Sequence, residues 1–294
     1  LARKGLSVIV LEASRIGWGA SGRNGGVVSA KFRLAYRDIA SRFGIDVARR
    51  MHDISIEAVA HVGELVRDYA IKDANYHATG SLRCAHNQVS LDAIKAECAW
   101  LNEALGDTAC SIQSAPQVAE ETGSNDFVGG MLNTHGGIIH PLNFVLGLAR
   151  GVQAEGIAIC ENTPVIGIKR EANGVIVETQ NAAIHAQTVV IATNSYSDLT
   201  KATAPVRKAI IPFRSAMIAT QSLTGTAGES LLKNGRSYTE TRRMMRWFRK
   251  SGDRLIYGGR GAFGKTDSEP AFAALQKAMV KQFPELQSVQ VTHR

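Results

Sequence analysis

The sequence predicts an α/β fold of two interleaved domains, one of them a doubly wound nucleotide-binding domain. Three observations lead to this prediction. An apolar run from Ser7 to Leu11 ends in the acid Glu12 and a glycine-rich loop, the pattern of a buried parallel strand with a binding loop at its carboxyl end. Long stretches with helical apolar spacing follow this loop. After residue 158 the pattern changes to short strands joined by turns.

The first half of the chain is predicted to be mainly helical. Leu1 to Gly5 is typical of the last turn of a helix, with Gly5 as the C-terminal cap. Apolar residues at three-to-four spacing predict a helix over Leu34 to Ile71, and a second helix over Ser90 to Leu105. Between them, Asn75 to Cys84 is expected to form a strand.

The second half contains one further helix and then mostly strands. Pro141 is placed to begin a helix that runs to Glu155. Asn173-Gly174 predicts a tight hairpin turn. The apolar run Thr188 to Thr193 (TVVIAT) is consistent with a central parallel strand. A second hairpin is expected to turn at Ser251-Gly252-Asp253 and to join Met244–Phe248 to Arg254–Gly258.

Composition is that of a globular protein with one large or two ordinary domains. The chain has 294 residues, of which 45% are hydrophobic and 20% charged. The sequence contains neither an apolar run of about 18 residues nor a secretory leader. We therefore predict a cytoplasmic protein without a transmembrane segment. The four cysteines form no CxxC pair, which favours free thiols in a reducing compartment. They are Cys84, Cys98, Cys110 and Cys160.

The positive charge of the chain is compatible with two kinds of ligand. Lys and Arg number 34 against 26 Asp and Glu, giving +8, which suits either nucleic acid or an anionic small ligand such as a dinucleotide. The densest basic run, Thr241 to Arg254, is interleaved with apolar residues such as Met244 and Phe248. This interleaving favours a half-buried hairpin over a nucleic-acid-binding arm. We therefore predict no nucleic-acid partner.

Glu12 is the most informative residue of the first motif. Gly17, Gly19 and Gly22 satisfy the GxGxxG pattern, but a dinucleotide fingerprint follows its strand directly and opens a helix. This match is therefore interpreted as accidental. A carboxylate at the tip of a parallel strand suits the vicinal hydroxyls of an adenosine ribose, which is the role we predict for Glu12. An ordinary strand-end carboxylate is the alternative.

The stretch Ser21 to Gly26 (SGRNGG) combines small residues, a hydroxyl, a guanidinium and an amide. Directly after a strand that ends in Glu, it is interpreted as a loop that binds a pyrophosphate and approaches an aromatic ring. A plain surface loop is the alternative. His135 and His140 have the spacing of some metal sites but no third ligand nearby, so we predict no metal. The sequence contains no nucleophile elbow or other catalytic pattern, and we name no catalytic acid or base.

Four stretches of the chain resemble the D-amino-acid oxidase (DAO) family of FAD-dependent oxidoreductases. They are VIVLEASRIGWGASGRNGG, HGGIIHPLNFVLGLA, VVIATNSYS and RWFRKSGDRLIYGGR. Within that family they are most similar to the branch of gamma-glutamylputrescine, glycine and sarcosine oxidases. The resemblance implies a glutathione-reductase-like FAD-binding Rossmann domain over residues 1–45 and 135–204. An antiparallel-sheet substrate domain would cover residues 46–134 and 205–294.

The resemblance also implies which residues would bind FAD. Glu12 would bind the ribose, the three residues after it would line the adenosine, and the SGRNGG stretch would run past the pyrophosphate toward the flavin. A backbone group in the strand-hairpin would meet adenine, and the VVIATNSYS loop would close the site. The expected FAD residues are Glu12, Ala13, Ser14, Arg15, Ser21, Gly22, Arg23, Asn24, Gly25, Gly26, Val165, Ala192, Thr193 and Asn194. Arg246, Trp247 and Tyr257 could face the flavin, although sheet packing is favoured for each.

The activity implied by the resemblance is oxidation of an amine or amino acid. Hydride transfer to the flavin would give an imine, and oxygen would then give H2O2. Two alternatives stay open, namely a dehydrogenase that passes electrons to a quinone or protein acceptor, and a non-catalytic nucleotide- or anion-binding module. Because the family has an upstream GxGxxG strand and a longer C-terminal portion, this chain is expected to be truncated at both ends and inactive alone.

Overall fold

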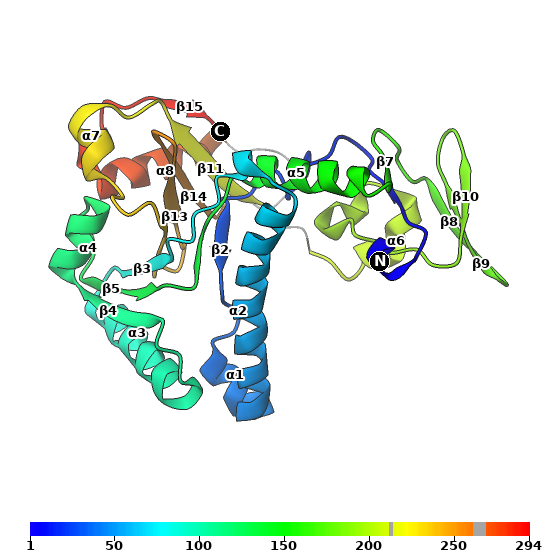
Figure 1. The fold of residues 1–294 in the computed structure, drawn as a ribbon. Coiled ribbons are helices and arrows are strands. Elements are labelled where there is room, and N and C mark those ends of the chain that lie inside the picture. Colours follow the sequence, from blue (N-terminus) through cyan, green and yellow to red (C-terminus); the bar gives the residue numbers. More distant parts are fainter. Residues whose placement is uncertain (212–213, 261–268) are drawn as a thin grey trace. The chain divides into compact units, whose positions relative to one another are not determined.

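The structure is a computed structural model that describes residues 1–211, 214–260 and 269–294. The described residues form two compact units (Figure 1). The smaller unit contains residues 1–23, 145–211 and 214, and the larger unit contains residues 24–144, 215–260 and 269–294. Helix α5 (Pro141–Ala154), which begins at the expected Pro141, crosses the boundary between residues 144 and 145. The assignment of FAD-binding and substrate domains stays a prediction.

The smaller unit begins with a short helical turn, Ala2–Lys4, which ends at Gly5 as expected. Gly5 has φ 81° and its N–H donates to the carbonyl of Ala2, the left-handed cap that glycine adopts readily. Strand β1 (Ile9–Leu11) then pairs in parallel with β7 (Ala158–Cys160).

The expectation that the first strand is buried is wrong. Among the described residues, β1 pairs with β7 alone. An apolar strand is buried when neighbouring strands and helices cover both of its faces. In this unit the side chains at the centre of the pair stay accessible, with Ile9 45% and Val10 41% exposed.

A three-stranded antiparallel sheet forms the rest of the strand content of the smaller unit. Its order is β10–β9–β8, with β8 (Gly167–Glu171), β9 (Gly174–Glu178) and β10 (Ala183–Ala186). The predicted hairpin between β8 and β9 is present, but it turns at Ala172-Asn173, one residue before the predicted Asn173-Gly174, and Gly174 (φ 147°) opens β9 opposite Glu171. Short helical turns follow at Asn194–Asp198, Lys201–Thr203 and α6 (Ala204–Arg207).

The predicted central strand Thr188 to Thr193 is not a strand. Within the described ranges its backbone pairs with no other strand, and Val190 is 73% exposed. An extended segment becomes a central strand when ladder hydrogen bonds satisfy its backbone on both sides. An apolar run carries the side-chain pattern of a strand without specifying those neighbours.

The larger unit is built on an eight-stranded mixed sheet, counted over the described residues, in the order β15–β11–β14–β13–β12–β3–β5–β4. All neighbours are antiparallel except β12 and β3, which run in parallel. The strands are β3 (Ser81–Ala85), β4 (Cys110–Ser114), β5 (Gly129–Asn133), β11 (Ser215–Thr220), β12 (Ser237–Glu240), β13 (Trp247–Ser251), β14 (Arg254–Arg260) and β15 (Val291–His293). A separate pair joins β2 (Val27–Ser29) to β6 (Gly136–Ile138).

Helices cover this sheet and divide its core into two clusters. Helices α3 (Gln88–Trp100) and α4 (Ala115–Thr122) lie along β3, β4 and β5, and α8 (Glu269–Gln282) lies beside β11 and β14 (Figure 1). Phe248 lies at the centre of one cluster, with its ring 5.6 Å from that of Tyr238 and 5.8 Å from that of Tyr257. The other cluster lies between α3, α1 (Tyr36–Phe43) and α2 (Ile45–Asp68).

The remaining helices of the larger unit are short. They are the turn Lys72–Ala74, the π-helical turn Leu101–Leu105 that extends α3, α7 (Gly225–Ser230) and the turn Pro284–Leu286. The predicted helix over Leu34 to Ile71 is present as α1 and α2, which are interrupted at Gly44. Of the helices in the described ranges, none combines the length and the apolar composition that a bilayer crossing requires.

Candidate functional site

The tip of β1 carries Glu12 in the smaller unit. The Glu12 N–H donates to the carbonyl of Cys160 (2.9 Å), and the Glu12 carbonyl accepts from the N–H of Thr163 (2.9 Å). The carboxylate oxygen Oε1 accepts from the N–H of Ser14 (2.8 Å), which orients the side chain. The second oxygen accepts from no donor among the described residues of the chain. Glu12 is therefore a half-buried, oriented carboxylate with one oxygen left for a ligand hydroxyl.

The residues after Glu12 are fixed by the loop that follows β7. Ser14 accepts through its carbonyl from the N–H of Asn162 (2.7 Å), and the N–H of Ile16 donates to the carboxylate of Glu161 (2.6 Å). Ala13 and Arg15 are exposed. The backbone of this segment is thus held on one side while its side chains face outward.

The loop from Ile16 to Arg23 packs on the segment that follows the TVVIAT run. The ring centroids of Trp18 and Tyr196 lie 5.5 Å apart, and the guanidinium carbon of Arg23 lies 5.0 Å from the Trp18 ring centroid. A Cβ at Gly19 would lie 3.1 Å from the Tyr196 ring, so the small residue permits this packing. Two motifs separated by about 170 residues are therefore adjacent within the smaller unit.

The expected residues Ala192, Thr193 and Asn194 lie beside this packing and are exposed. The Thr193 hydroxyl is hydrogen-bonded to that of Ser197 (2.7 Å). Asn194 has φ 45°, in the left-handed region, and begins the helical turn that carries Tyr196. Ala192 and Thr193 are therefore irregular, and Asn194 begins a helical turn, so these residues are not the tip of a strand.

Val165 has one backbone polar group with a hydrogen-bond partner among the described residues and one without. Its carbonyl accepts from the hydroxyl of Thr200 (2.8 Å). Its N–H is unbonded to any described residue. Of the two backbone groups expected to meet adenine, the N–H is available as a donor and the carbonyl already has one partner.

The SGRNGG stretch is divided between the units, with Asn24, Gly25 and Gly26 in the larger one. The side-chain oxygen of Asn24 accepts from the N–H of Gly26 (2.8 Å), closing a tight turn. Gly26 has φ 66°, and its carbonyl accepts from the N–H of Ile139 (2.9 Å). A Cβ on Gly25 would lie 2.6 Å from the ring of Trp247, on β13.

The two glycines are therefore required by packing inside the protein. A Cβ on Gly26 would lie 2.0 Å from the carbonyl oxygen of Ile139. Both glycines were expected to allow the approach of a ligand, and the contact of Gly25 with Trp247 was not predicted. The signal that could have found it is the β13–β14 hairpin, which presents Trp247 and Arg249 on the same side of a strand because side chains alternate.

The other residues that the sequence analysis singled out lie in ordinary environments. Gly17, Gly19 and Gly22 lie in turns and bends, and the next element is β2 rather than the helix that a dinucleotide fingerprint opens. His135 lies 3.7 Å from the buried Asp107, and the Nδ1 atom of His140 accepts from the N–H of Asn143 (3.2 Å). Among the described residues no group of three or more His, Cys, Asp and Glu is arranged to hold a metal.

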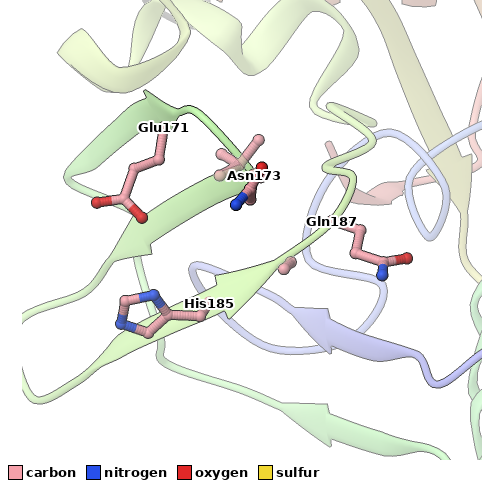
Figure 2. Close-up of a pocket in the computed structure, with 7 residues that line it drawn as sticks. Glu171, Asn173, His185 and Gln187 are labelled. Carbon is pink, nitrogen blue, oxygen red and sulfur yellow. The ribbon is translucent and has the colours of Figure 1, made fainter.

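A shallow hollow occurs at the small sheet of the smaller unit. Figure 2 shows Glu171, Asn173, His185 and Gln187 around it, at the β8–β9 turn and along β10. None of the residues that line it belongs to the predicted FAD set. The hollow is open, and the chemistry expected from the sequence does not involve it.

Comparison with known proteins decides the family. A model of the family described as DAO, FAD dependent oxidoreductase, matches residues 1–294. The chain belongs to this family. The expected family, the FAD dependence and the α/β fold class are thereby confirmed.

Among curated members, the chain is 30% identical over 296 residues to gamma-glutamylputrescine oxidoreductase of Escherichia coli, covering 100% of this chain and 68% of the relative. It is 29% identical to the probable oxidoreductase OrdL of Haemophilus influenzae, with 100% of this chain and 67% of the relative covered. The chain thus spans about two thirds of the length of these relatives.

Solved structures share the fold. Glycine oxidase from Geobacillus kaustophilus aligns with a TM-score of 0.74 at 17% identity, over 99% of this chain and 75% of the other. L-proline dehydrogenase from P. horikoshii aligns with a TM-score of 0.75 at 18% identity, over 99% and 74% of the two chains.

The residues of this chain fit part of an FAD site. Glu12 has one carboxylate oxygen available for a ribose hydroxyl, and Val165 has an available N–H. The position that a Cβ would take on Gly25 is occupied by the Trp247 ring, and the corresponding position on Gly26 by the carbonyl oxygen of Ile139. The missing side chains of these two glycines therefore leave no open space for a ligand.

Proposed function

We propose that this chain belongs to an enzyme that oxidises an amine or amino acid with FAD. The observation that carries the proposal is the match of the FAD-dependent family to residues 1–294. When bound, FAD would supply the redox chemistry: it would accept a hydride from the carbon beside the substrate nitrogen, water would convert the resulting imine to an aldehyde or keto acid, and oxygen would take up the two electrons as H2O2. The relative named gamma-glutamylputrescine oxidoreductase supports an amine as the substrate class. A cytoplasmic location stays a prediction.

The contribution that we assign to this chain is binding and orientation. Glu12 would accept hydrogen bonds from ribose hydroxyls, with its carboxylate held in position by the N–H of Ser14. The N–H of Val165 would donate to adenine, and Ala13–Arg15 would line the adenosine. Ser21–Gly26 and Ala192–Asn194 would approach the pyrophosphate and the flavin. We assign the FAD-binding role to residues 1–45 and 135–204 and the substrate role to residues 46–134 and 205–294.

Replacement of Glu12 tests the cofactor site directly. We expect Glu12→Ala to weaken FAD binding by about 1 to 3 kcal/mol, because hydrogen bonds between a charged carboxylate and the ribose are lost. Glu12→Gln retains an acceptor oxygen for Ser14 and should lose less affinity. The measurement is a titration of the FAD-free full-length protein with FAD, followed by flavin fluorescence.

Glu171→Ala is the matched control, since Glu171 is an exposed acid at the end of β8 in the same unit. Equal FAD affinity in Glu12→Ala and the control would contradict the ribose role.

Bleaching of bound FAD by an amine under anaerobic conditions, with H2O2 formed in air, tests the reaction. Bleaching without oxygen uptake would assign a dehydrogenase. A protein that stays colourless in the presence of added FAD would overturn the proposal and favour a non-catalytic binding module.

A further inference from the structure

Arg249 is a buried arginine that contacts the Asn24–Gly26 turn. It lies on β13, two residues after Trp247, and is 6% exposed. Its Nε donates to the carbonyl of Gly25 (2.5 Å), and one terminal nitrogen donates to the carbonyl of Ile139 (3.3 Å). The other terminal nitrogen donates to the carbonyl of Lys250 (2.9 Å). A single guanidinium thus donates to three backbone carbonyls. The first belongs to the Asn24–Gly26 turn, the second to the residue after β6, and the third to β13 itself.

The positive charge of Arg249 has no counter-ion in the described ranges of the chain. No carboxylate there lies within ion-pair distance, and its three recorded partners are backbone carbonyls. Burial lowers the pKa of the guanidinium to about 10, which still leaves it charged at neutral pH. A buried cation without a counter-ion costs free energy, and the carbonyl dipoles offset part of that cost.

The geometry of the turn depends on this contact. The Gly25 carbonyl points to Arg249, the Gly26 N–H points to the Asn24 side chain, and the Gly26 carbonyl accepts from Ile139. The Gly25 N–H is the backbone donor of the turn that bonds no described residue. Since Trp247 covers Gly25 on one side, Arg249 and Trp247 together clamp the glycine pair from β13.

We propose that Arg249 is a positioning residue that holds the Asn24–Gly26 turn through the carbonyls of Gly25 and Ile139 and places an uncompensated positive charge beside it. The turn is thereby kept in the shape that binds the anionic cofactor. The part of this proposal that concerns FAD rests on the proposed function. The part that concerns the turn does not, and it can be measured without FAD.

The first experiment is hydrogen exchange of the FAD-free full-length protein, read on a peptide that contains Asn24–Gly26. Arg249→Met should increase exchange in this peptide by about tenfold or more, since the bonds that fix the turn are lost. Arg254→Met is the matched control, because Arg254 also donates to a backbone carbonyl, that of Thr220 (2.8 Å), from the neighbouring strand. It should leave the turn unchanged. Unchanged exchange in Arg249→Met would overturn the proposal.

The second experiment separates the charge from the shape of the side chain. Arg249→Lys keeps a positive charge at this position. Burial should lower the pKa of this lysine into the pH range in which binding can be measured, because a lysine is deprotonated more readily than an arginine. A lysine is charged below its pKa, so the variant should bind FAD nearly as well as the unmodified protein at about pH 7 and lose about tenfold or more in affinity at about pH 9. The titratable residues next to Arg249 in the chain, on the paired strand and after Ile139 are Lys250, Arg254 and His140, and burial is the cause of the lowered pKa of Arg249.

The two readouts distinguish the two proposals. If the unmodified protein binds no FAD, the proposed function fails while hydrogen exchange still decides whether Arg249 holds the turn. If Arg249→Met does not fold, Arg249→Lys carries the test. An FAD affinity in Arg249→Lys that follows the unmodified protein at both pH values would overturn the role of the charge.

Discussion

At the scale of single residues, Gly25 illustrates how a glycine in a binding motif can be required by the protein itself. The Trp247 ring lies where a Cβ on Gly25 would be, at 2.6 Å, and where a Cβ on Gly258 would be, at 2.0 Å. The indole is therefore enclosed between two glycines on different elements of the larger unit. The absence of side chains there makes the close approach of strand and turn possible.

Gly25→Ala should destabilise the protein by about 1 to 3 kcal/mol, because the added methyl group overlaps the Trp247 ring and forces it to move. The measurement is urea unfolding. In a Trp247→Leu background the added methyl group should cost at least about 1 kcal/mol less, which a double-mutant cycle detects. Strictly additive costs would contradict direct packing of Trp247 on Gly25.

Several residues of the candidate site could be predicted from the sequence, and others could not. Glu12 is recognisable because a strand and its terminal acid are adjacent in the chain. Arg249 bonds Gly25 across 224 residues, and no local pattern records such a contact. Val165 and Ala192–Asn194 were expected by resemblance alone, and the bond from Thr200 to Val165 depends on a turn that propensity does not specify.

At the scale of elements, a buried polar pair joins helix α2 to the loop before β4. His52 Nε2 lies 2.9 Å from Asp107 Oδ2, and both side chains are buried. Asp107 also accepts from the N–H of Ala109 (2.8 Å), and the ring of Tyr36 contacts that of His52 edge to face. This contact connects α1 and α2 to the part of the sheet that they cover.

Asp107→Ala should lower the free energy of unfolding by about 2 to 4 kcal/mol, because the buried imidazole of His52 and the N–H of Ala109 lose their partner. Asp107→Asn should cost less, since one acceptor oxygen remains. Glu64→Ala removes the partner of His61 from the exposed face of the same helix and should change stability by less than about 0.5 kcal/mol. Denaturant titration measures all three, and equal costs for Asp107→Ala and Glu64→Ala would contradict the structural role of the pair.

Elements with local determinants were predicted well. Both predicted hairpins are present because turn residues specify them within a few positions. The first turns one residue earlier than predicted, at Ala172-Asn173, and the second turns at Gly252-Asp253, with Gly252 at φ 58°. Thr188–Thr193 was predicted wrongly because a parallel strand depends on neighbours that are distant in sequence.

At the scale of the whole molecule, the core of the larger unit contains ionisable groups that must stay neutral. Tyr238 donates its hydroxyl to Glu121 (3.0 Å) and Tyr257 donates to Gln282 (2.9 Å), and both rings are fully buried. Burial raises the pKa of both phenols. It also raises the pKa of the Cys110 thiol to about 12. All three groups therefore favour the folded state while they are protonated.

Stability should be constant near neutral pH and fall at alkaline pH. Because the folded-state pKa values lie above the unfolded ones, the stabilisation is complete below about pH 8, where an unfolded cysteine is still protonated, and is lost as the pH rises toward the folded values. We expect a loss of about 1 to 3 kcal/mol between about pH 8 and about pH 10, measured by urea unfolding. Cys110→Ser should reduce this loss, because the thiol is the first of the three groups to ionise in the unfolded chain. A flat profile up to about pH 10 would contradict the burial of these groups.

The parallel pairing of β12 with β3 has a consequence for synthesis of the chain. Ser81 pairs with Ser237, so the strand that completes the β3 edge leaves the ribosome after more than half of the chain. Until then β3, β5 and β4 form a three-stranded antiparallel sheet in which the β3 edge is unpaired, and such an edge is a site for aggregation. Pairing across so many residues is also slow, because the loop must close before the contact contributes. Completion of this sheet therefore has to wait for β12, and the β3 edge stays unpaired until that strand has been made.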